Sequence, residues 1–238
     1  MNKLEVCFSP ALLHLYDTTG ATVVIIDIFR ATSTIAAALA NGANSVIPVA
    51  TVPECIELGN NTPNSITAGE RDGKIAAGLK HGNSPSEYPA AFVAGKTLVL
   101  TTTNGTRLLH MVKDAHTIIT GSFLNLDAVC AFLLQQNTKV LLGCAGWKDR
   151  YNLEDSLFAG AVVNKLKDHF SINCDSARAA NYLYEHIGDK NIFEFLHDSS
   201  HYKRLASYGL EKDMAYCCTT NLHPVVPILR GNKLVVHT

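Results

Sequence analysis

The sequence of 238 residues lacks the short motifs that mark several large classes of protein. It has no G-x-x-x-x-G-K-[ST] phosphate-binding loop, no G-x-G-x-x-G fingerprint and no G-x-S-x-G turn. These absences count against a P-loop protein, a dinucleotide-binding fold and a serine hydrolase of the α/β type. The 7 cysteines include no C-x-x-C pair, and we interpret them as mostly buried thiols of a cytosolic protein.

Charge is also sparse and nearly balanced. Lys and Arg total 20, Asp and Glu total 21, and the net charge is −1. This balance gives no electrostatic reason to expect nucleic acid or an anionic membrane as a partner, whereas a small anionic molecule stays compatible with it. The first residues show no apolar segment followed by a cleavage site, and the apolar runs are too short to span a membrane. We therefore expect a cytoplasmic protein without membrane contact.

Apolar segments of strand length alternate with segments of helical period along the chain. The sequence is 47% hydrophobic and contains no linker or low-complexity run, so it can build a large core. The alternation predicts a three-layer α/β/α fold with a mainly parallel or mixed central sheet, formed by a single domain over 1–238 or by two closely packed α/β halves. Strands are expected at 23–26, 45–49, 97–100, 117–119 and 140–142, helices at 33–40, 52–59, 106–113, 126–135, 153–167, 176–186, 192–197 and 201–208, and a closing hairpin from 225–229 and 234–236.

The segment 27–34 joins a buried strand to a helix and carries several polar side chains. Asp27 ends the strand, and a carboxylate in this position can hold a hard cation such as Mg²⁺. Arg30 can fork onto a phosphate or carboxylate, and the hydroxyls of Thr32 and Ser33 lie at a helix N-terminus, which favours an anion. The alternative is that Asp27 caps the helix and Arg30 makes a surface ion pair. A carboxylate flanked by two isoleucines is costly unless it is paired or metal-bound, which favours the site.

A second polar loop follows the strand expected at 97–100. Its hydroxyls, its carboxamide, a glycine that lets the backbone approach a ligand, and its arginine together predict an oxyanion-binding loop. The alternative is a simple helix cap, which would need only one such residue. The candidate residues are Thr102, Thr103, Asn104, Gly105, Thr106 and Arg107.

Three further segments place polar groups in loops. Glu154 and Asp155 begin a helix, where they either interact favourably with its dipole or join the carboxylate of the first loop around a cation. Glu70 and Arg71 lie between glycines, and Asn83 lies in a turn-like Gly-Asn-Ser-Pro segment; a surface turn is the alternative explanation for both. Parallel strands present their C-terminal ends on one side of a sheet, so we expect the polar loops that follow strands to converge on one pocket.

Two other candidate groups have weaker support. His197 and His201 have a spacing that can bind zinc on a helix, but the glutamate of H-E-x-x-H and a third ligand nearby are missing from the sequence. Cys144 lies in a Gly-Cys-Ala-Gly segment, yet nothing in the sequence supplies a base for its thiol. A buried cysteine is therefore the better interpretation.

Motif segments in a characteristic order extend nearly from end to end of the chain. They are 8–13, 27–34, 68–71, 82–85, 101–106, 121–125, 144–146 with 153–155, 199–201 and 225–227. In these segments the sequence resembles the 2-phosphosulfolactate phosphatases, the ComB-like family. The resemblance implies an α/β/α fold and a Mg²⁺-dependent phosphatase. The named reaction of that family hydrolyses 2-phosphosulfolactate to sulfolactate and phosphate, a step of coenzyme M biosynthesis in methanogens, although relatives also occur in organisms that make no coenzyme M.

Taken together, the residues and the resemblance predict a site for a metal ion and a small anionic phosphoester. The predicted catalytic residues are Asp27 and Arg30, and the predicted Mg²⁺ ligands are Asp27, Glu70, Glu154 and Asp155. The predicted substrate-binding residues are Thr32, Ser33, Arg71, Asn83, Thr102, Thr103, Asn104, Gly105, Thr106 and Arg107. The arginines among them would clamp the phosphate, sulfonate and carboxylate groups of the substrate.

Several alternatives stay open at this point. A metal-bound water is the first choice of attacking group, and Asp27 as a covalent nucleophile is the second. The function is either the named reaction, the same chemistry on another small 2-phospho-carboxylate, or non-catalytic binding of an organic phosphate or sulfonate. We expect a homodimer only because homodimers are the commonest assemblies of soluble proteins.

Overall fold

The structure, a computed structural model, describes residues 1–102 and 105–238, and at 105 and 106 it describes the backbone alone. The described strands are β1 (Leu4–Cys7), β2 (Thr22–Ile26), β3 (Ser45–Val49), β4 (Ser65–Arg71), β5 (Lys74–Ile75), β6 (Thr97–Thr101), β7 (Thr117–Gly121), β8 (Val140–Cys144), β9 (Pro227–Arg230) and β10 (Lys233–Val236). The described α-helices are α1 (Ala31–Ala40), α2 (Val52–Asn61), α3 (Ala90–Val93), α4 (Gly105–Met111), α5 (Leu126–Gln135), α6 (Leu153–Leu166), α7 (Asp175–Ile187), α8 (Ile192–Phe195), α9 (Ser200–Ala206) and α10 (Glu211–Cys217). Short 3₁₀ turns add η1 (Pro10–Leu15), η2 (Pro85–Glu87), η3 (Phe123–Asn125) and η4 (Leu196–Asp198).

The strands join in one sheet, in the order β1-β8-β2-β7-β9-β10-β3-β6-β4-β5. Two blocks of parallel strands make up most of it: β1, β8, β2 and β7 form the first block, and β3, β6 and β4 form the second. The antiparallel hairpin β9–β10 separates them, with Ile228 opposite Ile119 of β7 and Leu234 opposite Val46 of β3. The predicted closing hairpin is therefore confirmed. The pairs β7–β9, β9–β10 and β10–β3 are all antiparallel, so the strands of the two blocks run in opposite directions.

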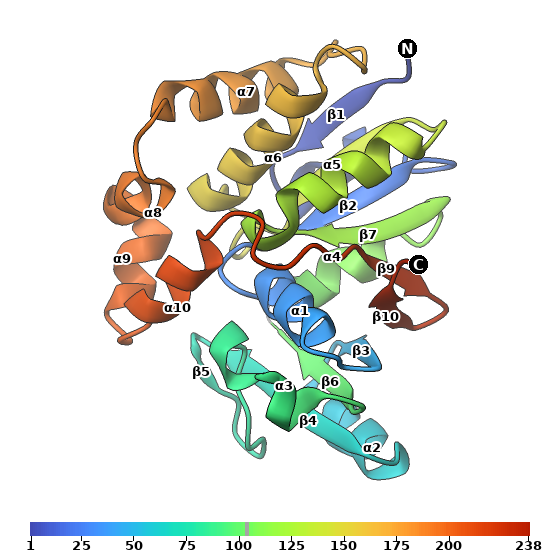
Figure 1. Cartoon of the computed structure of the whole chain (residues 1–238), viewed down its shortest axis with the longest axis vertical. Helices are drawn as coiled ribbons and strands as arrows, with labels where there is room; N and C mark the ends of the chain where they lie inside the picture. Colours follow the sequence, from blue (N-terminus) through green and yellow to red (C-terminus); the bar gives the residue numbers. More distant parts are fainter. Residues whose placement is uncertain (103–104) are drawn as a thin grey trace.

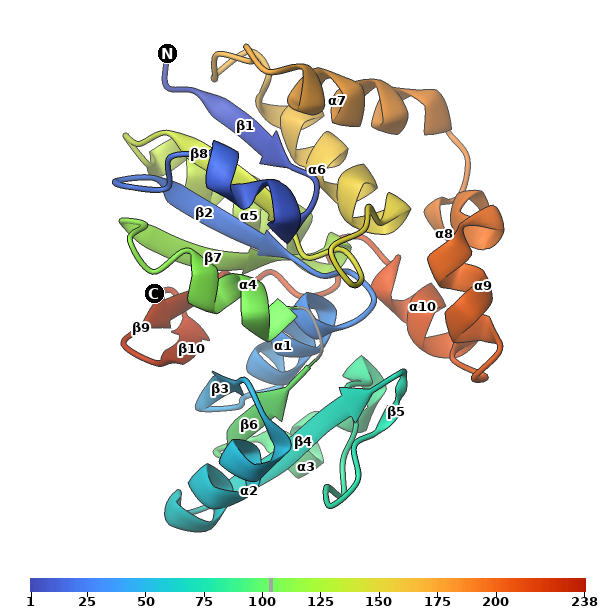
Figure 2. The ribbon, with the colours of Figure 1, turned by 180° about the vertical axis from the view of Figure 1, so that it is seen from behind.

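Twist nevertheless brings the ends of the two blocks together. Neighbouring strands in a sheet rotate by roughly 20–25° relative to one another, so the second block is steeply inclined to the first. Figure 2 shows the arrowheads of β2 and β4 both directed toward the side of the molecule that carries α9 and α10. The polar loops after β2, β6 and β8 all contribute to one pocket, as expected. Within each block the parallel strands present their C-terminal ends on one side, as expected, and the converging loops come from two blocks of opposite direction.

Helices cover both faces of the sheet. In the first block α5 and α6 lie over one face and α7 packs on α6, whereas η1 and α4 lie over the other (Figures 1 and 2). Val24 and Ile26 of β2 accordingly join one apolar cluster, and Val23 and Ile25 join the other. A parallel sheet with helices on both faces requires strands that are apolar on both sides. The predicted three-layer α/β/α fold is therefore confirmed. None of the described helices combines the length and the apolar character that crossing a membrane would need.

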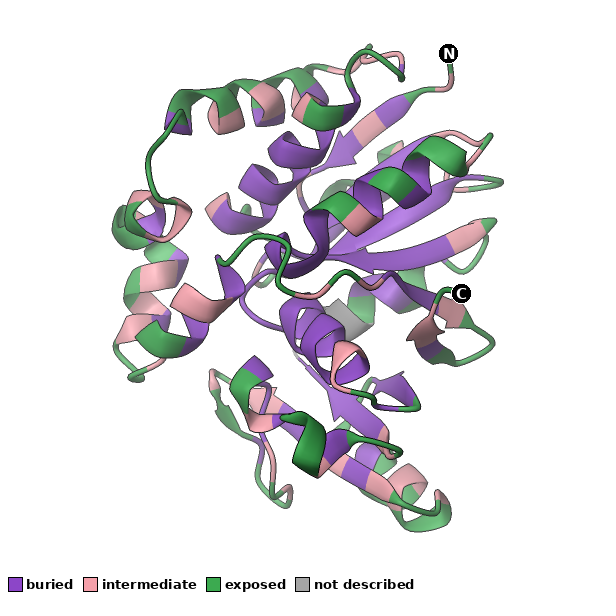
Figure 3. Ribbon diagram, in the orientation of Figure 1, coloured by how far each residue is buried: buried purple, intermediate pink, exposed green. Residues whose placement is uncertain are grey.

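Helix α1 lies at the centre of the molecule and is buried from residue 31 to residue 39 (Figure 3). Its run of three alanines lets β7, the hairpin and β3 approach closely. The polar residues of its first turn bond to nearby backbone: Ser33 Oγ donates to the Ile28 carbonyl at 3.0 Å, and Thr34 Oγ1 donates to the Asn83 carbonyl at 3.0 Å. Because buried hydroxyls need such partners, these bonds fix the loop after β2 against the segment that carries Asn83.

Most predicted elements appear with shifts of a few residues, and β3 and α5 have the predicted bounds. β1, β4, β5, α3 and α10 were not predicted from the sequence. β4 contains an Ala-Gly pair and polar residues, which have low strand propensity, and it is held in the sheet by its parallel ladder with β6. Glu70 and Arg71, which a surface turn could have explained, lie at the end of this strand.

Candidate active site

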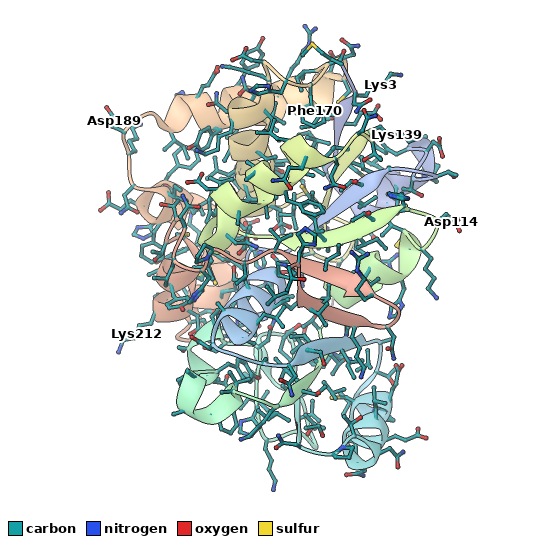
Figure 4. All side chains as sticks on the ribbon, turned by 45° about the vertical axis from the view of Figure 1, so that its right-hand side comes forward. Lys3, Asp114, Lys139, Phe170, Asp189 and Lys212 are labelled. Carbon is teal, nitrogen blue, oxygen red and sulfur yellow. The ribbon has the colours of Figure 1, made fainter. Side chains whose placement is uncertain are left out.

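A small group of charged side chains is buried, against the general trend of the chain. Figure 4 shows labelled charged side chains such as Lys3, Asp114 and Lys212 pointing away from the body of the molecule. Burying a charge costs free energy unless the charge is paired, so a cluster of buried charges indicates a functional site. The buried charged residues of the described chain are Asp27, Arg30, Glu154, Asp155 and Asp213. All of them lie around the loop that follows β2.

A pocket with a volume of about 390 Å³, its open mouth included, lies beside these charges. Its walls come from the ends of β2, β4, β6 and β8, from the loop before η2 and from α9. The described residues that line it are Asp27, Phe29, Arg30, Glu70, Asp72, Gly73, Asn83, Thr102, Trp147, His201, Arg204 and Leu205. The position at the C-terminal ends of strands and the mostly polar lining suit a small, strongly polar ligand.

Hydrogen bonds within the loop after β2 hold Asp27 in place. The Thr32 hydroxyl accepts from the Asp27 N–H at 3.1 Å and donates to the Asp27 carbonyl at 2.9 Å, while Ser33 is bonded to the Ile28 carbonyl. Thr32 and Ser33, which we predicted as donors to a substrate, thus bond the backbone of their own loop. The Asp27 carboxylate accepts a long bond of 3.4 Å from the Ala31 N–H at the start of α1, so it also lies at a helix N-terminus.

The surroundings of Asp27 shift its protonation equilibrium toward neutral pH. Burial raises the pKa of Asp27 to about 6, and the carboxylates of Glu70 and Glu154 also raise it, whereas His201 lowers it. A carboxyl group with a pKa in this range either exchanges a proton near neutral pH or, when a cation is present, binds the cation in place of the proton.

Arg30 is held by a carboxylate from a distant part of the chain. Its Nη1 lies 2.5 Å from Asp213 Oδ2, and its Nη2 donates to the Gly73 carbonyl at 3.4 Å. The other oxygen of Asp213 accepts from Ser84 Oγ at 2.7 Å. Arg30 is only 5% exposed, so the alternative of a surface ion pair was wrong. The pair positions a guanidinium group at the pocket wall next to Asp27.

A buried carboxylate also orients the ring of His201. Glu154 Oε1 lies 2.5 Å from His201 Nδ1, while Glu154 Oε2 is buried with no hydrogen-bond partner among the described residues. His201 lines the pocket, and no described residue is hydrogen-bonded to its Nε2. From the sequence, His201 was a candidate ligand only for zinc, together with His197, whose ring instead packs against Phe193 and Tyr202.

Asp155 holds two loops together behind the pocket. Its Oδ1 accepts from the Ile28 N–H at 2.9 Å, and its Oδ2 accepts from the Gly146 N–H at 3.0 Å. Burial raises the pKa of Asp155 well above its ordinary value, and the carboxylates of Glu154 and Asp27 also raise it. The structure therefore gives Asp155 the role of a tie between the loops that follow β2 and β8.

Neighbouring residues at the end of β4 face opposite sides of the sheet, as the period of a strand requires. Glu70 lines the pocket, and its Oε2 accepts from the Gly73 N–H at 2.9 Å. Arg71 is not among the described residues that line the pocket, and it donates from Nη2 to Thr101 Oγ1 at 3.0 Å. Gly69 precedes them, and a Cβ atom there would lie 2.4 Å from the Thr101 carbonyl oxygen. Only glycine fits between β4 and β6 at this point.

Trp147 and Arg204, which were not predicted as site residues, form another part of the wall. Arg204 Cζ lies 4.0 Å from the centre of the Trp147 ring, so the guanidinium stacks on the indole. Trp147 belongs to the loop after β8, and Arg204 belongs to α9, three residues after His201. Arg107, by contrast, forms an exposed ion pair with Asp149 at 2.8 Å.

The structure brings some of the predicted residues together and leaves others apart. Asp27, Arg30, Glu70, Asn83 and Thr102 line the pocket. Thr32, Ser33, Arg71, Arg107, Glu154 and Asp155 are described but are not among its lining residues. Thr103 and Asn104 lie outside the described residues, and Gly105 and Thr106 begin α4 with side chains outside the description. Asp72, Trp147, His201, Arg204 and Asp213 were not predicted as site residues, although the motif segment 199–201 contains His201 and Trp147 lies in the polar loop that follows the strand at 140–142.

The donors that face the pocket match the preferences of Mg²⁺. This ion usually binds through one or two carboxylates and completes its shell with waters and substrate phosphate oxygens. Asp27 and Glu70 line the same pocket and interact electrostatically, and the orphaned Glu154 Oε2 adds negative charge nearby. The described part of the chain contains no group of three or more His, Cys, Asp or Glu residues arranged to hold a metal ion. The pocket therefore suits a Mg²⁺ ion that takes one or two ligands from protein carboxylates and the others from water and substrate.

Comparisons with known proteins identify the family of the chain. Residues 7–232 match the model of the family described as 2-phosphosulpholactate phosphatase. The chain belongs to this family. A protein of Thermotoga petrophila named probable 2-phosphosulfolactate phosphatase is 45% identical over 215 residues, which cover 90% of this chain and 92% of that protein. A protein of the same name from Clostridium acetobutylicum is 37% identical over 236 residues, 98% of this chain and 100% of that protein.

The family assignment predicted from the motif order is confirmed. Several motif segments that carried the resemblance also meet in space, because 27–34, 68–71, 82–85 and 199–201 each contribute a residue to the pocket. The family name describes a phosphoric monoester hydrolase, and the pocket is the place in the described chain where buried charges of both signs meet.

Proposed function

We propose that this chain is a Mg²⁺-dependent phosphatase that hydrolyses 2-phosphosulfolactate to sulfolactate and phosphate. The observation that carries the proposal is the placement of Asp27 beside Arg30 at the end of a buried strand, facing the same pocket as Glu70. A carboxylate pair and a positioned guanidinium are the groups that phosphoryl transfer needs for a hard cation and for the phosphate oxygens. The names of the relatives support the substrate.

In this proposal Asp27 and Glu70 hold the magnesium ion. When bound, the ion supplies positive charge to a phosphate oxygen as the P–O bond breaks. Arg30, fixed by Asp213, binds other oxygens of the same phosphate, and Asn83, which also lines the pocket, offers a neutral donor. Positioning and electrostatic stabilisation of this kind account for most of the catalysis in phosphoryl transfer.

His201 is the residue we propose for proton transfer. Its Nδ1 is engaged by Glu154, which leaves Nε2 as the atom that can give a proton to the leaving alkoxide or take one from the attacking water. An adjacent carboxylate that orients a histidine and stabilises its charged form is a recurrent arrangement in hydrolases. The glutamate and histidine come from α6 and α9, so the site depends on the position of α9 relative to the start of α6.

The identity of the attacking group separates two versions of the mechanism. Water is the first choice, because Asp27 has a bond to the start of α1 and lies where the cation would bind. The second is attack by Asp27 itself, with a phosphoryl-aspartate intermediate. Rapid acid quenching followed by intact-mass measurement distinguishes them, since only the second leaves a phosphoryl group on the protein, and Asp27→Asn abolishes it.

The proposed function is tested by phosphate release from racemic 2-phosphosulfolactate with Mg²⁺ and with EDTA, beside 2-phospholactate and phosphoglycolate. We expect release that needs Mg²⁺ and prefers the sulfonated ester. Faster hydrolysis of one of the other esters would mean that the substrate is another 2-phospho-carboxylate. No release from any ester by the folded protein would favour a binding protein. Asp27→Asn with wild-type turnover and Mg²⁺ dependence would exclude both versions of the mechanism.

A further inference from the structure

Two guanidinium groups line the pocket, together with the carboxylates of Asp27, Glu70 and Asp72. Near the loop after β2, Asp27 and Arg30 lie together, and the charge of Arg30 is balanced by Asp213 at 2.5 Å. On the wall built by α9 lies a second guanidinium, that of Arg204. No described carboxylate lies within ion-pair distance of Arg204. The pocket therefore contains a cation whose charge the described residues do not pair directly.

Arg204 is held in a defined orientation. Its guanidinium carbon lies 4.0 Å from the centre of the Trp147 ring, and the side chain is half-buried. Stacking fixes the plane of a guanidinium and leaves the N–H groups at its edge free to donate in that plane. Burial lowers the pKa of Arg204, with Tyr208 and the more distant carboxylates of the pocket acting against this shift. A partly desolvated guanidinium without a paired carboxylate is a suitable partner for an anion.

The position of Arg204 matches one particular group of a substrate. The phosphate belongs beside Asp27 and Arg30, where the proposed cation and the start of α1 lie. Trp147 and Arg204 line the same pocket, so their wall is a candidate place for a second anion on the same short carbon chain. A sulfonate is a weak ligand for a hard cation but offers three oxygens to N–H donors, so it suits a guanidinium better than a metal. Arg71 and Arg107, which we predicted for this role, lie outside the described lining of the pocket.

On the basis of the proposed function, we infer that Arg204, stacked on Trp147, binds the sulfonate of the substrate and determines the preference for a sulfonated ester. The guanidinium edge donates to sulfonate oxygens, and the indole holds the guanidinium in the plane that this requires. Removing the sulfonate from the substrate leaves the buried side of Arg204 unpaired, and a site built for a polar group discriminates strongly against an analogue that lacks it.

The test compares two esters that differ by the sulfonate alone, 2-phosphosulfolactate and 2-phospholactate. Arg204→Met removes the charge and keeps the length, and Arg204→Lys keeps the charge but loses the planar fork. Lys203→Met on the same helix, where Lys203 is exposed and paired with Asp198, is the matched control. We expect Arg204→Met to lower kcat/KM for the sulfonated ester about 100-fold, as loss of a charge-assisted bond predicts, and to change that for 2-phospholactate less than about 3-fold.

Arg204→Lys should recover part of the lost preference, and Trp147→Leu should reduce it in a way that is not additive with Arg204→Met. An equal loss for both esters would overturn the inference, because Arg204 would then act on the phosphate or the carboxylate, which both esters share, or on the fold. No loss for either ester would overturn it as well. Circular dichroism and thermal unfolding of each variant show whether the fold is kept, and Arg204→Lys serves if Arg204→Met does not fold.

A binding measurement separates failure of the inference from failure of the proposed function. If the wild-type protein hydrolyses neither ester, calorimetric titration with sulfolactate still reports on the subsite. Binding that is lost in Arg204→Met and kept in Lys203→Met supports the subsite even though the phosphatase proposal has failed. Equal affinity of wild type and Arg204→Met for sulfolactate, or no binding by either, overturns the subsite.

Discussion

Arg30 and Asp213, 183 positions apart in the sequence, form a buried ion pair with 2.5 Å between Nη1 and Oδ2. Arg30 precedes α1 at the end of the first polar loop, and Asp213 belongs to α10, so the pair joins the centre of the molecule to its last helix. Ser84 Oγ donates to the second oxygen of Asp213 at 2.7 Å. A single carboxylate thus fixes the guanidinium proposed to bind phosphate and the loop that carries Asn83.

Asp213→Asn should impair both the stability and the activity of the protein. Removing one partner of a buried ion pair leaves the other charge uncompensated and typically costs about 3–5 kcal/mol. We expect urea unfolding to show a loss of this order, and phosphate release to show kcat/KM lower by at least about 10-fold, since Arg30 loses its position. Glu211→Gln, an exposed change on the same helix, is the control.

A double-mutant cycle shows whether the effect belongs to the pair. Arg30→Met combined with Asp213→Asn should cost clearly less stability than the sum of the two single changes, because the double variant leaves no buried charge unpaired. If the single changes were additive, or if Asp213→Asn unfolded at the same urea concentration as Glu211→Gln, the pair would not hold this part of the fold together.

His201→Asn tests the proposed proton transfer with little change of shape. The amide nitrogen of asparagine occupies nearly the place of Nδ1, so the bond to Glu154 is retained while Nε2 is lost. We expect kcat to fall by about 10²–10⁴-fold, the range for loss of a general acid or base, with KM nearly unchanged. His197→Asn, whose ring lies against Phe193 outside the pocket, should keep wild-type kcat. Equal kcat for wild type and His201→Asn would assign the histidine a purely structural role.

The sequence predicted those site residues that can be recognised from their immediate neighbours in the chain. Asp27 and Arg30 were recognisable because a carboxylate directly after a run of buried aliphatic residues is costly without a purpose. Glu70 and Arg71 were recognised as a pair, yet only Glu70 lines the pocket. The missing information was that they end a strand, in which adjacent side chains face opposite sides, so at most one of the two could face the pocket.

The residues that were missed depend on contacts between distant parts of the chain. Arg204 and His201 lie on α9, a helix of 7 residues, and Asp213 lies on α10, which is equally short. Helices of this length are held by tertiary packing more than by their own propensity, so nothing in their local sequence shows which face meets the loop after β2. The opposed strand blocks are a similar case, because only the pairing of β9 with β7 and of β10 with β3 reveals them.

Gly160→Ala should destabilise the protein although alanine is the better helix former. A Cβ atom at Gly160 in α6 would lie 2.0 Å from the Ala180 carbonyl oxygen in α7, so the two helices would have to separate. Overpacking of this kind costs about 1–3 kcal/mol, more than the gain of up to about 1 kcal/mol from helix propensity. The midpoint of urea unfolding measures the difference.

Gly59→Ala in α2 is the matched control for the change at Gly160. Its Cβ atom would meet Thr67 Cγ2 at 2.1 Å, the end of a side chain that can rotate, instead of backbone. We therefore expect a clearly smaller loss of stability at Gly59. A larger loss at Gly59 than at Gly160 would contradict the close contact between the backbones of α6 and α7.

The stabilising effect of Mg²⁺ should depend on pH through Asp27. Burial raises the pKa of Asp27 from 3.8 to about 6 in the folded chain without metal. Below about pH 6 a proton therefore competes with the cation for this carboxylate, and binding should weaken up to tenfold for each further pH unit. Thermal unfolding with Mg²⁺ and with EDTA should show a Tm difference that is nearly constant near pH 8 and shrinks as the pH falls below about 6.

In the absence of metal, Asp27→Asn should stabilise the protein at neutral and alkaline pH. A raised carboxyl pKa contributes stability that is fully present below pH 3.8 and is lost as the pH rises through about 6, because the unfolded chain releases its proton first. Replacing Asp27 removes that loss, so in EDTA near pH 8 the variant should be more stable than wild type by up to about 3 kcal/mol. It should also lose the Tm shift with Mg²⁺. A variant less stable than wild type in EDTA, or one that keeps the Mg²⁺ shift, would show that the carboxylate of Asp27 is satisfied by the fold and not reserved for a cation.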